Sequence, residues 1–108
     1  MINLTLPKKY AEALFRAALE QGRLDEVKAD IELMAASLKF NENLFKIIKH
    51  PGISKAEKTS LISKEYKKKA SKIAVDFLCL LIDKKREEIF FTVVDLSLIH
   101  ISEPTRPY

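Results

Sequence analysis

The chain has 108 residues, of which 47% are hydrophobic and 31% are charged, and its formal net charge is +4. This length fits one domain with a modest core, because a chain of this size buries only about two-thirds of its surface on folding. The longest apolar run, residues 73–82, is well short of the roughly 20 residues that cross a bilayer, so we expect a soluble chain. The single cysteine, Cys79, excludes an internal disulfide framework.

Helix-forming residues dominate the sequence. Only two Gly and four Pro interrupt long runs of Ala, Leu, Lys and Glu, and no stretch alternates as a half-buried strand does. We therefore predict an all-α fold, a bundle of six helices. The first helix is predicted over residues 7–21, with Thr5 as its N-cap, Pro7 in its first turn and Gly22 as its C-terminal cap.

This first helix has more apolar residues than a small core needs. Its charged residues recur every four positions and form one narrow solvated stripe: Lys8, Glu12, Arg16 and Glu20. The rest of the circumference is apolar and consists of Tyr10, Ala11, Ala13, Leu14, Phe15, Ala17, Ala18 and Leu19. These additional apolar residues predict that the helix has a second role besides packing in the core.

The next three helices follow ordinary patterns. Residues 24–39 have apolar residues at alternating spacings of three and four, which predicts one buried seam and a need for one neighbour: Leu24, Val27, Ile31, Met34 and Leu38. A short helix follows within residues 41–50, and Pro51 and Gly52 end it. Ser54 and Glu57 have capping-box spacing, so we expect a fourth helix to start there.

The fifth helix is predicted within residues 67–86 and the sixth within residues 87–96. Residues 73–82 are apolar in almost every direction around the axis, and only Asp76 interrupts them. Such a helix is either central in its bundle or shared with a partner. Two interpretations stay open: the first and fifth helices are the central pair, or they form a hydrophobic groove for an amphipathic helix of another protein. The small alanines of the first helix favour the groove, because they let a foreign helix approach closely.

The residue types do not favour catalysis. The sequence has no Gly-rich phosphate loop, no metal-ligand spacing and no nucleophile beside a base, so we expect no catalytic site, no metal and no cofactor. His50 precedes Pro51 at a helix end, where we expect it to face the helix dipole. Cys79 lies in an apolar run, which is typical of a small core residue.

A basic run at residues 64–72, KEYKKKASK, indicates a different class of function. Clustered lysines are a feature of nucleic-acid binding. Lysines crowded into one connection between helices usually form a solvated face, however, and only Tyr66 is available there to stack on a base. A small basic helical nucleic-acid-binding domain is therefore the alternative function. Attraction of the lysines to anionic lipid would be secondary.

Three segments follow one another in a specific order: YAEALFRAALEQGRLDEV at residues 10–27, NENLFKIIKHPGISKAEKTSLI at residues 41–62, and VDFLCLLIDKKRE at residues 75–87. Over about residues 5–96 the chain thereby resembles the N-terminal domain of the ATP synthase delta subunit, called the oligomycin-sensitivity-conferring protein in mitochondria. The resemblance implies a six-helix bundle that binds the N-terminal helix of an alpha subunit between its first and fifth helices. This binding would use the surplus apolar face.

The resemblance also implies a part in ATP synthesis and hydrogen ion transport without an active site. Such a stator subunit links the catalytic head of the proton-translocating ATP synthase to the peripheral stalk, whose b subunit would bind through a missing C-terminal domain. It lies at the cytoplasmic face of the bacterial inner membrane, as a peripheral part of the complex. The residues that the resemblance places against the alpha-subunit helix are Tyr10, Ala13, Leu14, Ala17, Phe77, Leu80, Leu81 and Lys84.

Two features depart from the family's pattern. Lys85 stands where family members often have glycine, so we expect a tighter or more helical turn between the fifth and sixth helices. The end of the chain, SLIHISEPTRPY at residues 97–108, resembles translated sequencing-adapter sequence, and its prolines would not extend a helix. We therefore expect a helical domain at residues 1–96 and a non-native, disordered tail at residues 97–108.

Overall fold

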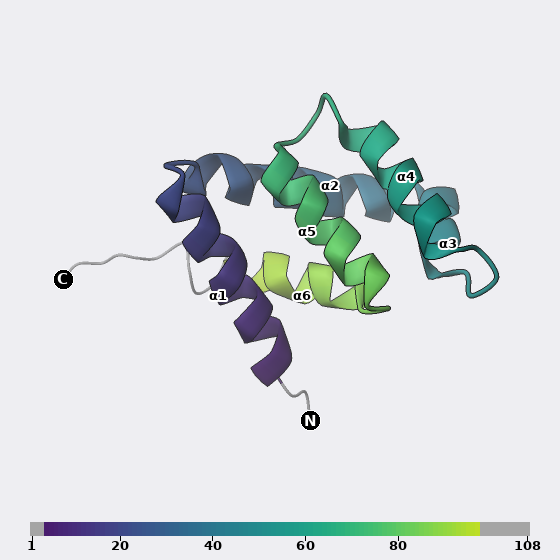
Figure 1. Cartoon of the computed structure of the whole chain (residues 1–108), viewed down its shortest axis with the longest axis horizontal. Coiled ribbons are helices and arrows are strands. Elements are labelled where there is room, and N and C mark those ends of the chain that lie inside the picture. Colours follow the sequence, from purple (N-terminus) through teal and green to yellow (C-terminus); the bar gives the residue numbers. More distant parts are fainter. Residues whose placement is uncertain (1–3, 98–108) are drawn as a thin grey trace.

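The structure is a computed structural model that describes residues 4–97, and these residues form six α-helices (Figure 1). In chain order the helices are α1 Thr5–Glu20, α2 Leu24–Phe40, α3 Glu42–Lys49, α4 Lys55–Tyr66, α5 Lys72–Asp83 and α6 Glu87–Leu96. No strand occurs within residues 4–97. The prediction of an all-α bundle of six helices is confirmed. Of the predicted tail, Ser97 is buried, and residues 98–108 lie outside the described residues.

α1 begins two residues earlier than predicted. The first intrahelical bond runs from the N–H of Lys8 to the carbonyl of Leu4 at 2.9 Å, so Leu4 is the N-cap, and its side chain makes no capping hydrogen bond. The prediction that Thr5 is the N-cap is therefore wrong. Pro7 lies in the first turn, where its missing N–H costs no intrahelical hydrogen bond, and its side chain is buried.

Gly22 ends α1, as predicted. Its φ of 68° lies in the left-handed region, which glycine enters without a steric penalty. The N–H of Arg23 donates to the carbonyl of Ala18 at 2.8 Å, and the N–H of Gly22 donates to that of Leu19 at 3.0 Å. These two bonds form the Schellman pattern, which satisfies the last carbonyls of a helix.

The same kind of turn joins α5 to α6, with a lysine in the glycine position. Lys85 has a φ of 58°. Its N–H donates to Ile82 at 3.0 Å, and the N–H of Arg86 donates to Leu81 at 2.7 Å. The expectation of a tighter or more helical turn is wrong, because two Schellman hydrogen bonds hold the left-handed conformation despite the lysine Cβ.

Side chains cap the starts of three helices. The side-chain oxygen of Asn41 accepts the N–H of Leu44 at 3.1 Å and caps the start of α3. Ser54 and Glu57 form the predicted capping box at the start of α4. Ser71 caps α5, and its own N–H donates to the carboxylate of Asp30 at 2.7 Å. This last bond ties the start of α5 to α2.

The core lies where α2, α5 and α6 meet. The predicted seam of α2 is confirmed, since four of its residues are fully buried and Leu24 packs against them. The side chains exposed by no more than 2% on these three helices are Val27, Ile31, Met34, Leu38, Ala74, Leu78, Leu81, Ile82, Phe90 and Val93. Phe90 touches the rings of Phe77 and Phe91, with centroids 6.2 and 6.0 Å away.

α5 has α1 on one side and α4 on the other, and it crosses in front of α2 in Figure 1. α1 also packs along α6, so the first and last helices in the chain are neighbours in space. The arrangement places α1 and α5, the two helices with surplus apolar residues, side by side.

Candidate partner-binding surface between α1 and α5

α1 has a second apolar face next to the one that it buries. Leu6, Tyr10, Ala13 and Ala17 follow at spacings of four, three and four residues, so they lie within about 60° of one another around the axis. Leu6 is 37% exposed, Ala13 is exposed, and Tyr10 and Ala17 are half-buried. The core face of α1 consists of Ala11 and the four other buried residues in phase with it, and it lies to one side of this strip.

α5 leaves an apolar strip on its side nearest α1. The ring of Phe77 packs edge-on against that of Tyr10, with centroids 6.3 Å apart, so this side of α5 faces α1. Ile73, Leu80 and Lys84 lie four residues before and three and seven residues after Phe77, which places them on the same side. Leu80 is 43% exposed, Ile73 is half-buried and Lys84 is exposed.

We call these two strips together the α1–α5 surface. It consists of Leu6, Tyr10, Ala13, Ala17, Ile73, Leu80 and Lys84.

Arg86 joins the two helices at one end of this surface. Its Nη1 donates to the hydroxyl of Tyr10 at 2.8 Å, and its guanidinium lies 6.0 Å from the centre of the Tyr10 ring. Because Arg86 directly follows the left-handed Lys85, the turn between α5 and α6 aims it at α1. Tyr10 is thereby held between Phe77 and a cation, and positive charge borders the apolar strips.

The structure divides the predicted contact residues into two groups. Tyr10, Ala13, Ala17, Leu80 and Lys84 reach the surface. The other three belong to the core, with exposures of 5%, 7% and 0%: Leu14, Phe77 and Leu81. Residues of the second group can support the surface only from beneath.

Sequence reasoning missed three residues of this region. Leu6 is in phase with Tyr10 and Ala13, and extending the helix by one turn toward its start would have found it. Ile73 is in phase with Leu80 in the same way. Arg86 gave no local signal, since its partner Tyr10 lies 76 residues away in the chain.

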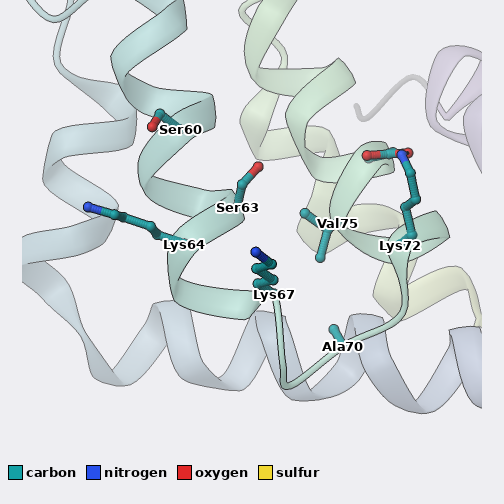
Figure 2. Close-up of a pocket in the computed structure, with 8 residues that line it drawn as sticks. Ser60, Ser63, Lys64, Lys67, Ala70, Lys72 and Val75 are labelled. Carbon is teal, nitrogen blue, oxygen red and sulfur yellow. The ribbon is translucent and has the colours of Figure 1, made fainter.

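The basic run lies beside a hollow of about 490 Å³ between α4 and α5. Figure 2 shows Ser63 and Lys67 reaching toward the space between these helices, whereas Lys64 extends away from it. Lys64 and Lys67 therefore point in different directions.

Two further lysines of the run are paired with carboxylates. Lys72 donates to Asp76 at 2.7 Å, which raises the pKa of Lys72, and Lys69 donates to Glu65 at 3.3 Å. This pairing and the divergent directions fit a solvated face better than the single basic face that phosphate binding uses.

Cys79 and His50 have structural environments. Cys79 is half-buried, and its Sγ donates to the carbonyl of Thr59 at 3.8 Å. Burial raises the pKa of this thiol and disfavours the reactive thiolate. Nδ1 of His50 accepts the N–H of Gly52 at 2.9 Å and thereby stabilises the turn after α3.

Within residues 4–97, no three His, Cys, Asp or Glu side chains gather as metal ligands. No helix of this range is long and apolar enough to span a membrane.

The sequence model described as ATP synthase delta (OSCP) subunit matches residues 6–100 of the chain. The chain belongs to this family. It is 38% identical to ATP synthase subunit delta of Brevibacillus brevis, over 83% of this chain and 54% of that protein. It is 36% identical to ATP synthase subunit delta of Halothermothrix orenii, over 81% of this chain and 46% of that protein. It is also 36% identical to ATP synthase subunit delta of Lachnoclostridium phytofermentans, over 89% of this chain and 53% of that protein.

The chain spans about half the length of these delta-subunit relatives. No solved structure matches the chain.

In this delta-family chain, the surplus apolar residues of α1 and α5 divide between the core and the surface. α5 is largely a central helix, because six of its residues are buried. Leu80 and Ile73 are the apolar residues of α5 that are not fully buried on the side facing α1. α1 buries five residues and leaves over the strip that contains Ala13.

Proposed function

We propose that this chain is the N-terminal domain of a delta subunit, and that it binds the N-terminal helix of an alpha subunit along the α1–α5 surface. The observation that carries the proposal is the pair of partly exposed apolar strips, one on each helix, held next to each other by the Tyr10–Phe77 contact. An amphipathic helix that lays its apolar side on both strips would remove them from water.

The side chains suggest how the helix would be held. Ala13 and Ala17 are small, so the backbone of the incoming helix can approach α1 closely. Leu80 protrudes from α5 and can insert between its side chains. Lys84 and Arg86 favour an acidic residue at the end of the bound helix that lies beside them.

Such a domain would act mechanically and would catalyse no reaction. It would hold the catalytic head, while the second half of the delta subunit, which the longer relatives have, holds the b subunit of the peripheral stalk. The complex would then keep the head from turning with the rotor. The chain would lie at the cytoplasmic face of the bacterial inner membrane, as a peripheral part of the ATP synthase.

Isothermal titration calorimetry at low micromolar protein, with a peptide of the alpha-subunit N-terminus as the titrant, measures the Kd and tests this proposal. Leu80→Ala removes an anchor, and truncation of such a contact costs on the order of 2 kcal/mol, or about a thirtyfold rise in Kd. Ala13→Trp fills space that the partner needs and should weaken binding at least as much.

Two matched variants serve as controls. Leu33→Ala truncates a leucine of similar exposure on α2, 49% against 43% for Leu80, and should leave the Kd unchanged. Ala56→Trp adds the same bulk on the exposed side of α4. If Ala13→Trp keeps the parent's melting temperature and binds the peptide as tightly as the parent does, the α1–α5 surface is not the binding site.

A further inference from the structure

α2 has an apolar stripe on the side that points away from the core. Ala29, Leu33, Ala36 and Phe40 are all exposed, Leu33 by 49% and Phe40 by 90%. Spacings of four, three and four residues place them within about 60° of one another around the helix. We call these four residues the α2 stripe. The prediction that this helix needs one neighbour is wrong, because α2 packs against α1, α3, α5 and α6. It also keeps this second, exposed apolar face.

The α2 stripe is complementary to itself when two copies lie antiparallel. A two-fold axis between Leu33 and Ala36 places Leu33 of one copy opposite Ala36 of the other, and Ala29 opposite Phe40. Each large side chain then meets a small one along the whole stripe, so the two helices can pack closely. The helix dipoles of the two copies also run in opposite directions, which favours this arrangement.

The charged residues beside the stripe agree with the same register. Glu32 and Lys39 are seven residues apart and lie on the same flank of α2. In a two-fold antiparallel pair, like flanks meet, so Lys39 of one copy lies within about 3 Å, along the axis, of the level of Glu32 in the other. Lys39 is exposed, and its ammonium now lies 5.7 Å from the centre of the Phe91 ring, from which its flexible stem can turn. Symmetry forms this ion pair twice.

We propose that α2 is a self-association surface through which two copies of the chain pair antiparallel. The stripe covers about 17 Å of helix, and the area that it can bury is smaller than the ~800 Å² per partner of stable complexes. The association is therefore weak, with a Kd on the order of 0.1–1 mM. It uses none of the residues of the α1–α5 surface.

Sedimentation velocity on the full 108-residue chain, from about 10 μM to about 1 mM, tests the proposal. The weight-average mass should rise from the monomer value of 12.4 kDa toward twice that value as the concentration increases. A chain that stays monomeric over the whole range overturns the proposal.

Variants locate the contact. Leu33→Glu places two like charges near the two-fold axis and should raise the Kd at least tenfold, whereas Leu19→Glu, at a residue of α1 that is 64% exposed, should leave it unchanged. Either single substitution, Ala29→Phe or Phe40→Ala, should weaken association. The double variant should restore it, because a large side chain at position 29 then meets a small one at position 40 of the other copy. Association that survives Leu33→Glu, or a double variant no better than the single ones, overturns the antiparallel pairing through α2.

Discussion

Lys85 is the one non-glycine residue with a positive φ among residues 4–97. A side chain in this left-handed region crowds the backbone and costs roughly 1–2 kcal/mol relative to the right-handed region. Two Schellman hydrogen bonds hold this geometry, and the turn thereby aims Arg86 at Tyr10. The strain is thus coupled to the α1–α5 surface.

Lys85→Gly should stabilise the domain. Glycine removes the crowding but makes the unfolded chain more flexible, so we expect a net gain of about 0.5–1 kcal/mol and a rise in Tm of a few degrees. Thermal unfolding followed by circular dichroism measures the change.

Gly22→Lys is the reverse experiment at the equivalent turn. A Cβ at Gly22 meets no atom within 4 Å, so any loss of stability there comes from backbone strain alone. We expect a loss similar in size to the gain from Lys85→Gly. A lower Tm for Lys85→Gly would mean that the lysine side chain itself stabilises the turn.

At the scale of the helix, the contact between Asp30 and Ser71 connects α2 to the start of α5. The carboxylate accepts an N–H that has no partner within α5, and it places a negative charge at the positive end of the helix dipole. Asp30 therefore acts as a second cap of α5, supplied by another helix.

Asp30→Ala should lower the free energy of unfolding by about 1–3 kcal/mol, because it leaves a partly buried N–H without an acceptor. Asp30→Asn keeps an acceptor oxygen and should cost less. Urea denaturation of both variants measures the difference, and Glu32→Ala on the same helix serves as the control. Equal losses for Ala and Asn would mean that charge, and not the hydrogen bond, carries the effect.

The helices could be predicted from the sequence because their ends have local signals. The capping box of Ser54 and Glu57 and the left-handed Gly22 are examples, and the α2 seam follows from its spacing. The conformation of Lys85 could not be predicted, since the hydrogen bonds that hold it form only when α5 ends there.

The candidate surface could be predicted only in part. On α1 the resemblance places Tyr10, Ala13, Leu14 and Ala17 against the partner, and the structure buries Leu14 and leaves the other three at the surface. On α5 nearly every residue is apolar, so the pattern could not separate Leu80, which is exposed, from Leu81, which is buried. The assignment of these residues to a partner stays a prediction.

At the scale of the whole molecule, two phenylalanines have opposite environments. Phe90 has no exposed surface and touches the rings of Phe77 and Phe91, whereas Phe40 is 90% exposed at the end of α2. A domain of this size has a total stability of only about 5–15 kcal/mol. The two side chains therefore contribute to that stability very unequally.

Phe90→Ala should lower the free energy of unfolding by about 3–5 kcal/mol, because it opens a cavity where three helices meet. Phe40→Ala should change it by less than about 0.5 kcal/mol at micromolar concentration. Denaturant unfolding of both variants side by side gives the comparison. A large loss for Phe40→Ala would show that its ring is buried in the folded chain in solution.

The packing of α1 along α6, with Arg86 bonded to Tyr10, also affects how the chain folds during synthesis. The ribosome makes Tyr10 76 residues before Arg86, which at about 5–20 residues per second means a delay of roughly 4–15 s. During this time α1 has made neither of these native contacts, and its apolar residues lack α6 as a neighbour. The domain can therefore complete its fold only after α6 has emerged, and until then the apolar side chains of α1 that α6 covers stay exposed and prone to aggregation.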